Sequence, residues 1–426
     1  MTQIEDALRD SNPWWKAAFK TEYRERDVYR QIQKFLPLPQ VLALTGLRRV
    51  GKTTLMLKIT EDSINSGFDP QRIIYFSFDE FREVALRAVV KEYERIMEKN
   101  PREGKYLLLL DEIQKLTDWE EQLKRMYDTF GKNIKIIISG SESLLIKRKS
   151  KETLAGRLFS FKVEPLTFKE YLNFRGIYLK PVGLYENELS KLFGEFTITL
   201  GFPELANTKE KDVIRKYIKE SIVDKIVYRD IPKLFRIKDA SILESLLEIF
   251  MDEPGQLIEV TQLAKELKIS RQALSNYLRY LEESFLIRKL YNFSRSRRKV
   301  ERKLKKYYPT LISVDVLFKE DDLSKSKTFE WLLVNQLQAE FFWRDPYKNE
   351  VDIVLPNNQP TPIEIKHGKI TLKGILAFMN KFNVTHGYVI SKSEEKLEKM
   401  GEKTINIIPA YKFLLDNPQA NIARNH

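Results

Sequence analysis

The segment "GLRRVGKT", residues 46–53, restricts the fold of this chain more than any other part of the sequence. It matches the pattern G-x-x-x-x-G-K-[ST], with the apolar run "QVLALT" before it and a helical pattern after it. Glycines in such a loop let backbone N–H groups wrap around phosphate groups at the start of a helix. The sequence therefore predicts a buried strand, a phosphate-binding loop and a helix in succession.

Four further apolar runs, "QRIIYFSF", "KYLLLLDE", "IKIIISGS" and "LFSFKVEPL", alternate with helical stretches after this loop. Such alternation is typical of a parallel sheet that helices cover on both faces. We therefore expect the α/β class, with a P-loop parallel-sheet domain in the first part of the chain.

The loop residues have expected roles in binding ATP and Mg²⁺. Lys52 should reach the β- and γ-phosphates, and Thr53 should offer its hydroxyl to Mg²⁺. The strand "YLLLLDEIQ" should present Asp111 to the same metal and Glu112 to the attacking water. The residues predicted to bind the nucleotide are Gly46, Leu47, Arg48, Arg49, Val50, Gly51, Lys52, Thr53, Thr54, Asp111 and Ser141.

Two further parts of an ATP-hydrolysing site are open to alternatives. "IIISGSES" predicts the strand beside the phosphate loop, and either Ser139 or Ser141 would orient the γ-phosphate or the water; an ordinary turn is the alternative. Arg157 lies just before the next predicted strand, where it would stabilise transition-state charge. If Arg157 acts on a neighbouring chain, the protein must form a homo-oligomer. Arg148 is another candidate, as are Arg48 and Arg49.

Composition excludes several classes of protein and site. The 426 residues suggest two to four domains, and the absence of cysteine excludes disulfides and thiolate metal sites. The three histidines are scattered, which argues against a histidine-rich zinc site. No apolar run approaches the roughly 18 residues of a membrane helix. We expect a cytoplasmic protein without a membrane-bound part.

A net charge of +13 is most concentrated in "RKLYNFSRSRRKVERKLKKYY", residues 288–308, where Glu301 is the only acid. We call this stretch the basic segment. One interpretation is a stripe that binds the phosphates of DNA, and the alternative is an ordinary solvated surface.

Residues 257–290 read as helix, turn, helix and strand, which predicts a winged helix. Thr261 should cap the first helix and Ser270 the second. The second helix should bury Leu274, Tyr277, Leu278 and Leu281. Its outward residues Arg271, Gln272, Ser275, Asn276 and Arg279 would face a major groove of DNA, unless the helix serves only for packing.

The chain resembles the prokaryotic, largely archaeal, AAA-type ATPases that carry a C-terminal domain of restriction-endonuclease-like fold. The resemblance lies in "GLRRVGKTTL", "LLLLDEIQ", "ISGSES", "LAGRLFSFKVEPLTFKEYL", "GFPE", "RDI" and "EVDIVL" with "PIEIKHG". It implies a five-stranded P-loop sheet, a helical lid, a winged helix and a nuclease-like tail. Residues 1–35 read as helical, with "NPWW" as an Asn-Pro helix start. The expected domains are therefore an N-terminal helical segment (1–35), a P-loop ATPase domain (36–165), a helical lid (166–250), a winged helix with the basic segment (251–309) and a nuclease-like domain (310–426).

The stretch "EVDIVLPNNQPTPIEIK" has the form of a nuclease hairpin. If the hairpin is symmetric about Asn358, Asp352 lies opposite Glu364 with Cβ atoms roughly 5 Å apart. Lys366 shares their face and would orient or activate the hydrolytic water beside a metal. If the register of the hairpin differs, Glu350 replaces Asp352 as the metal ligand.

The resemblance adds Glu330, in "KTFEWLLVNQL", as a further metal ligand. The expected function is an ATPase that acts on DNA or is regulated by it, and a metal-dependent nuclease activity remains open. The alternative is a nucleotide-dependent switch or scaffold that binds a protein partner through a silent nuclease-like domain. The predicted catalytic residues are Glu112, Lys52, Arg157, Asp352, Glu364 and Lys366, and the predicted metal ligands are Thr53, Asp111, Glu330, Asp352 and Glu364.

Overall fold

The structure, a computed structural model, describes residues 3–81, 83–140, 154, 156–235, 237 and 240–416. Ser141 and Arg148 lie outside the described residues. The chain divides into two units, Met1–Pro165 and Leu166–His426. The predicted segments 1–35 and 36–165 fall within the first unit, and the other three fall within the second.

A five-stranded sheet forms the centre of the first unit, with strand order β2-β3-β4-β1-β5 and every neighbouring pair parallel. Its central strands are apolar and buried along their whole length, as both-face coverage by helices requires. The strands are β1 (Val41–Thr45), β2 (Ile73–Ser77), β3 (Tyr106–Asp111), β4 (Ile134–Gly140) and β5 (Leu158–Lys162). The predicted parallel α/β sheet is therefore confirmed.

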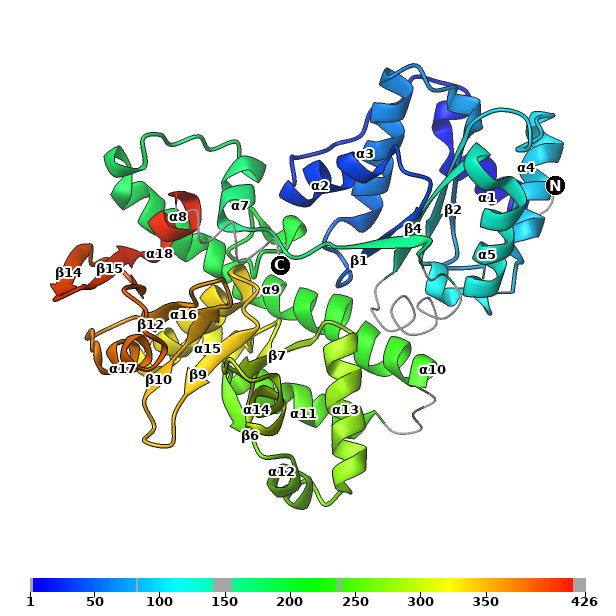
Figure 1. The fold of residues 1–426 in the computed structure, drawn as a ribbon. Helices are drawn as coiled ribbons and strands as arrows, with labels where there is room; N and C mark the ends of the chain where they lie inside the picture. The colour runs from blue at the N-terminus through cyan, green and yellow to red at the C-terminus, as the bar shows by residue number, and fades with distance from the viewer. Residues whose placement is uncertain are drawn as a thin grey trace. The chain divides into compact units, whose positions relative to one another are not determined.

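Helices connect the strands on both faces of this sheet. Helix α3 (Lys52–Asn65) lies on one face, whereas α4 (Leu86–Met97) and α5 (Trp119–Phe130) lie on the other (Figure 1). This arrangement follows from right-handed crossovers, because the chain moves outward from β1 to β2 and then back towards β4. Short 3₁₀ turns complete the connections: η2 (Pro70–Arg72), η3 (Ile113–Lys115) and η4 (Gly131–Asn133).

The N-terminal segment is fastened to the edge strand β2. It contains α1 (Gln3–Ser11), η1 (Pro13–Trp15) and α2 (Asp27–Phe35). The Asn12 side chain accepts from Tyr75 N (2.7 Å) and donates to Tyr75 O (2.9 Å), as a neighbouring strand would. Trp14 and Trp15 both donate their indole N–H to Ile73 O, at 3.1 and 2.8 Å. These bonds cover an otherwise open sheet edge.

The second unit begins with helices, as predicted for 166–250. They are α7 (Phe168–Phe174), η6 (Val182–Leu184), α8 (Glu186–Ile198), η7 (Pro203–Leu205), α9 (Lys211–Lys216), the π-helical η8 (Tyr217–Val223) and η9 (Lys225–Asp230), α10 (Ile231–Phe235) and α11 (Ser241–Asp252). Phe168, Tyr171, Phe193 and Phe196 pack their rings together between α7 and α8.

The next sheet has the order β10-β9-β7-β8-β6. Its strands are β6 (Gln256–Ile258), β7 (Ile287–Asn292), β8 (Lys305–Pro309), β9 (Phe341–Arg344) and β10 (Glu350–Val351). Strand β7 pairs antiparallel with β8 and parallel with β9. One sheet therefore joins the predicted segments 251–309 and 310–426, which the sequence does not suggest.

Helices α12 (Val260–Glu266) and α13 (Arg271–Glu283) lie between β6 and β7, and α14 (Arg297–Arg302) lies between β7 and β8. Ser270 caps α13 as predicted, since its side chain accepts from Ala273 N at 3.1 Å. The prediction for Thr261 is wrong. Glu259 caps α12 instead, because its carboxylate accepts from the N–H groups of Thr261 (3.1 Å) and Gln262 (2.6 Å).

A third sheet follows, with the order β11-β12-β13-β15-β14. Its strands are β11 (Ile353–Leu355), β12 (Thr361–Lys366), β13 (His386–Ser391), β14 (Lys396–Met400) and β15 (Lys403–Pro409). The helices of this region are α15 (Val314–Leu317), α16 (Asp322–Gln336), α17 (Lys373–Phe382) and α18 (Ala410–Asp416). Side chains of α17, β13 and β15 form a core with Ile375, Met379, Val389, Ile405 and Ile407. None of the helices in the described ranges is both long and apolar enough to span a bilayer.

Candidate functional site

The phosphate loop lies at the carboxyl end of β1, where its backbone conformation requires glycine. Gly46 has φ +146°, and a Cβ there would stand 2.2 Å from Val163 O. Gly51 has φ +96° and precedes the first residue of α3. The loop therefore approaches the backbone after β5 closely and then turns directly into the helix, as the motif predicts.

The ammonium group of Lys52 lies inside this loop. Lys52 is buried, and its Nζ donates to Gly46 O (3.0 Å) and Leu47 O (2.8 Å). These carbonyl groups hold a positive charge within the loop, on the side chain expected to reach the phosphates.

Asp111 and Thr53 meet as the predicted metal ligands should. Thr53 Oγ1 donates to Asp111 Oδ2 at 2.6 Å, and Tyr75 Oη donates to the same oxygen at 2.9 Å. Ser139 donates to the other carboxylate oxygen, and the N–H of Glu112 lies 3.1 Å from it. A hydroxyl and a carboxylate are hard oxygen ligands, so this pair fits Mg²⁺ in chemistry and placement.

Burial and the neighbouring Asp111 raise the pKa of Tyr75, which keeps its phenol protonated as a hydrogen-bond donor. Tyr75 and the hydroxyl of Ser139 thus fix the orientation of the Asp111 carboxylate. The sequence predicts that Ser139 or Ser141 orients the γ-phosphate or the water. Ser139 contacts Asp111 instead, and the role of Tyr75 was missed because a tyrosine inside a strand has no motif.

Glu112 stands directly after β3 with φ +53°. Burial raises the pKa of its carboxyl group against the lowering effect of Lys52, and Asp111 raises it further. Gln114 Nε2 donates to Glu112 Oε2 at 2.7 Å. The group is therefore half-buried, oriented by Gln114 and more basic than an ordinary glutamate, as a proton acceptor needs to be.

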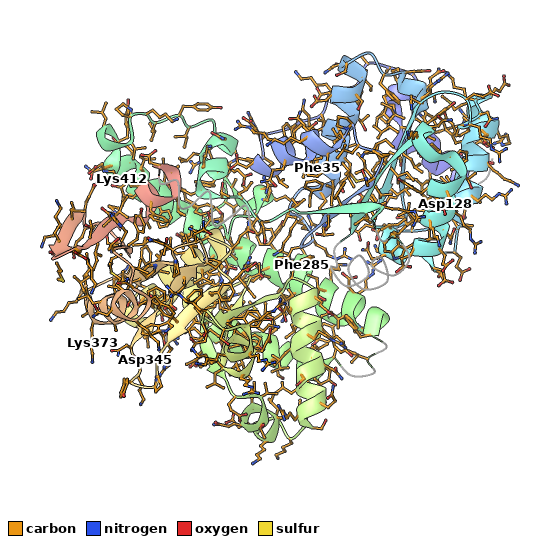
Figure 2. All side chains as sticks on the ribbon, viewed as in Figure 1. Phe35, Asp128, Phe285, Asp345, Lys373 and Lys412 are labelled. Carbon is orange, nitrogen blue, oxygen red and sulfur yellow. The ribbon has the colours of Figure 1, made fainter. Side chains whose placement is uncertain are left out.

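Arg157 does not lie at this site. It precedes β5, which runs parallel to β1 with Val41 opposite Leu158, so it stands at the amino ends of the strands. The phosphate loop lies at the carboxyl ends, roughly 15 Å away along the strand. Arg157 Nε lies 3.6 Å from Asp128 Oδ1, on α5 (Asp128 is labelled in Figure 2). A role on the phosphates of its own chain is therefore wrong, whereas a role on a neighbouring chain stays a prediction.

Arg26 supports the phosphate loop, and the sequence analysis missed it. Its guanidinium is buried and donates to Val50 O (2.8 Å) and Glu164 O (2.6 Å). These bonds tie the loop to the chain that leaves β5. An arginine in the polar stretch "TEYRERD" carries no sequence signal for such a role.

A second candidate site lies on the hairpin of β11 and β12. Ile353 pairs with Ile363 and Leu355 with Thr361, which places Asp352 opposite Glu364. The predicted register is therefore confirmed. Both carboxylates are buried, and Lys366 Nζ lies 2.7 Å from Glu364 Oε1. Asp352 Oδ2 accepts from Ile365 N at 2.7 Å.

Lys306, on β8, is the unexpected member of this site. Its Nζ lies 2.5 Å from Glu350 Oε1 and 3.6 Å from Glu330 Oε1. Burial acts to lower the pKa of Lys306, but Tyr308 and the surrounding carboxylates raise it well above its ordinary value. Lys306 is therefore a buried, charged ammonium among carboxylates, close to where a divalent metal would be expected.

The carboxylate of Glu330 contacts Tyr308 and Lys306. Tyr308 Oη donates to Glu330 Oε1 at 2.5 Å, in addition to the contact with Lys306. Among the described residues, no three histidine, aspartate or glutamate side chains are grouped so as to hold a metal ion. The predicted ligand set Glu330, Asp352 and Glu364 is therefore not assembled. Glu364 Oε2 is buried without a hydrogen-bond partner, which marks the position that such an ion would have to reach.

The basic segment is divided by the fold. Lys306 is buried, Lys289 Nζ pairs with Glu282 at 2.8 Å, and Lys303 Nζ donates to Asn292 Oδ1 at 3.1 Å. The residues that stay exposed lie on α14 or beside it: Arg295, Arg297, Arg298, Lys299 and Arg302. A single continuous stripe is therefore wrong, because β7 and β8 turn part of it inward.

Helix α13 presents the residues expected to face DNA. Arg271, Gln272, Ser275 and Arg279 are exposed and Asn276 is half-buried, whereas Leu274, Leu278 and Leu281 are buried. Tyr277 is half-buried rather than fully enclosed.

Three family models match the chain. Residues 38–172 match an AAA domain, and residues 190–310 and 330–413 match two domains of unknown function, DUF8612 and DUF4143. Two uncharacterized proteins of Methanocaldococcus jannaschii are similar along much of their length. One is 28% identical and covers 88% of this chain and 85% of its own, and the other is 29% identical and covers 76% and 71%.

The solved structures that the chain matches include Cdc6p from Pyrobaculum aerophilum and AMPPCP-bound DnaA from Aquifex aeolicus. Cdc6p is 15% identical with a TM-score of 0.32 and covers 75% of this chain and 98% of its own. DnaA is 17% identical with a TM-score of 0.28 and covers 60% and 86%. The family match and the geometry of the phosphate loop together identify residues 38–172 as an AAA-type P-loop domain.

Proposed function

We propose that the first unit binds and hydrolyses ATP with Mg²⁺, and that DNA bound by the second unit regulates this turnover. The observation that carries the proposal is the meeting of Thr53 with Asp111 at 2.6 Å, next to Glu112 and Lys52. Lys52 and Thr53 stand at the start of α3, and Asp111 and Glu112 stand at the end of β3. A cation, a hydroxyl and two carboxylates in this arrangement are the groups that phosphoryl transfer to water requires.

The side chains would divide the work as follows. Lys52 would exchange the carbonyls of Gly46 and Leu47 for the β- and γ-phosphates. Glu112 would accept the proton of the attacking water, helped by its raised pKa. Thr53 and Asp111 would hold Mg²⁺, which supplies positive charge to the phosphate oxygens. Tyr75 would keep Asp111 in the ligating orientation.

DNA is the proposed regulator because α13 has the order and surface of a recognition helix. It follows α12 after a short turn, and β7 and β8 follow it as an antiparallel pair, which supports the winged helix expected from the sequence. Arg271 and Arg279 lie on its exposed face. Exposed cations on such a helix suit the phosphates and guanine edges of a major groove.

The test is ATP turnover of the full chain with and without duplex DNA, measured at increasing salt. We expect turnover that DNA stimulates and that salt returns to its basal rate. The variant Arg271→Gln/Arg279→Gln should lose the stimulation, and Lys396→Gln/Lys399→Gln, an equal change of charge on the exposed strand β14, should retain it. Stimulation that survives in the α13 variant would contradict the proposed DNA contact.

A second proposal concerns the nuclease-like region of 310–426, and Lys306 favours it. We propose that the ammonium of Lys306 compensates the carboxylates of Glu330, Glu350 and Asp352, so that this domain is a silent scaffold without a metal. The domain would then serve to bind DNA or a protein partner.

Mn²⁺ titrations by calorimetry, combined with cleavage assays on single-stranded and branched DNA, test this second proposal. The carboxylate ligand of the nucleotide-binding unit should be removed with Asp111→Asn, so that the metal site of that unit does not contribute. We expect neither Mn²⁺ binding nor cleavage in this background, and Mn²⁺ binding after Lys306→Ala removes the competing charge. DNA cleavage that depends on Asp352 and Lys366 would instead establish a nuclease.

A further inference from the structure

A cavity of about 720 Å³ in the second unit lies apart from both candidate sites. The end of β7 and the chain around α14 form one side, and β9 with the turn after it forms another. The C-terminal end of α17 completes the wall. Asp345, labelled in Figure 2, follows β9 directly and marks the turn. A cavity of this volume is large enough for a ligand the size of a nucleotide.

The wall of the cavity is strongly positive. Five cationic side chains from different elements line it: Arg295, Lys299, Lys303, Arg344 and Lys381. The one acidic residue of the lining, Asp345, accepts from the backbone N–H and the side-chain amide of Asn349, both at 2.9 Å. The cavity therefore concentrates positive charge with little compensation.

Most of these cations lack a carboxylate partner. Arg344 alone among the five has one within 4 Å in the described part of the chain, Glu350 at 3.2 Å. Arg295 and Lys303 donate to the backbone carbonyls of Phe382 (2.8 Å) and Phe293 (3.4 Å). Burial, and then repulsion from Lys381 and Lys299, lowers the pKa of Lys303. A bound anion would remove this repulsion.

Aromatic groups accompany the charge. Phe293, Trp343 and Phe382 pack together as an apolar floor, and Lys381 Nζ lies 5.3 Å from the Trp343 ring. The turn that carries Asp345 and Pro346 continues into Tyr347, which is 85% exposed. An exposed ring that directly follows the lining residue Pro346 in the chain offers a stacking surface for a base.

We propose that this cavity binds a nucleoside phosphate. The phosphate would lie among Lys299, Lys303 and Arg295, and the base would stack on the exposed ring of Tyr347. The nucleotide is either free or the phosphorylated end of a single strand. Binding in this cavity needs neither the phosphate loop nor α13. The assay for this cavity therefore tests a different proposal from the assay for DNA-stimulated ATP turnover.

The test measures binding of two fluorescently labelled probes, thymidine 5′-monophosphate and a 5′-phosphorylated ten-residue thymidine strand. The full chain should carry Lys52→Ala so that the phosphate loop does not compete. We expect saturable binding of at least one probe, which weakens as salt rises. Binding of both probes identifies a free nucleotide as a ligand, and binding of the strand alone identifies a strand end.

Two variants locate the site. Lys299→Gln/Lys303→Gln should weaken binding by about tenfold or more, because two of the expected phosphate contacts lose their charge. Ser296→Glu places a carboxylate on the lining and should have the same effect without changing the half-buried Lys303. The matched control Lys373→Gln/Lys399→Gln changes two exposed lysines outside the lining and should bind as the parent does.

Thermal melting of each variant shows that it is folded. The proposal is overturned if neither probe binds the parent chain, or if Ser296→Glu and the control bind equally well. A 5′-hydroxyl strand that binds as tightly as the phosphorylated one overturns the phosphate assignment.

Discussion

Asp352, which directly precedes β11, and Glu364, on the paired strand β12, are both buried carboxyl groups. Burial, followed by the charges of Glu364 and Glu330, raises the pKa of Asp352 well above its ordinary value. Folding therefore favours the protonated form of this carboxyl. Its contribution to stability is present below the ordinary pKa of aspartate and is lost as the pH rises through the higher folded-state pKa.

Asp352→Asn should consequently stabilise the protein at neutral pH. The amide oxygen can still accept from Ile365 N, whereas the cost of burying an ionisable carboxyl beside Glu364 is removed. We expect a rise in melting temperature of about 2–4 °C at pH 7.5, the shift that roughly 1 kcal/mol produces in a domain of this size. The gain should shrink as the pH falls towards 4, where the wild-type carboxyl is protonated. A lower melting temperature at pH 7.5 would mean that Lys306 depends on this charge.

At the nucleotide site, substitutions of Lys52 and Glu112 should impair different steps, namely ATP binding and ATP hydrolysis. Lys52→Ala should weaken ATP binding by at least tenfold, because the phosphates lose their principal cation. Glu112→Gln should bind ATP normally and hydrolyse it at least 100-fold more slowly, because only the proton acceptor is lost. Equilibrium binding of a fluorescent ATP analogue and single-turnover hydrolysis separate these effects. Wild-type hydrolysis by Glu112→Gln would assign the proton acceptor to another group.

At the scale of elements, contacts between segments far apart in sequence decide what each element does. Asn12 replaces a neighbouring strand for Tyr75, 63 residues away, and Arg26 holds the phosphate loop to Glu164. The sequence predicts a helical turn at "NPWW", which the structure has at Pro13–Trp15, but it does not predict that this turn docks on β2. Periodicity predicts which face of an element is buried without naming the element that covers it.

Asn12→Ala should destabilise the first unit by about 2–4 kcal/mol. The change removes both hydrogen bonds to β2 and leaves the buried N–H and C=O of Tyr75 without partners. Urea unfolding should show a lower midpoint for the transition of this unit. Asn133→Ala, which removes one exposed bond to Arg102 O, is the matched control and should change the midpoint little.

At the scale of the molecule, sequence motifs predicted the chemical groups of the sites better than they predicted how the chain divides into domains. The parallel sheet, the phosphate loop and the Asp352–Glu364 register follow from local pattern, since each depends on residues that are neighbours in a motif or hairpin. The position of Arg157 and the burial of Lys306 depend on strand order and on which sheet face is covered. Neither property is encoded near those residues.

The parallel pair of β7 and β9 predicts that residues 166–416 behave as one folded body. A chain that ends at residue 309 loses β9, exposing the edge of β7 and the ring of Phe293 that packs on Phe378 and Phe382. It should be largely insoluble or show no cooperative melting of its second unit, whereas residues 166–416 alone should melt cooperatively. Circular dichroism on both chains checks this, and a well-folded 1–309 chain would refute it.

Strand order in the first unit also has a consequence for synthesis on the ribosome. Strand β1 is made before its two neighbours, since β4 ends at Gly140 and β5 at Lys162. The phosphate loop next to β1 therefore waits for more than a hundred further residues before its surroundings exist, and the partner of Arg26 at Glu164 emerges later still. Nucleotide present during translation can thus bind and stabilise the first unit only when the synthesis of this unit is ending. By then almost all of the unit has already left the exit tunnel.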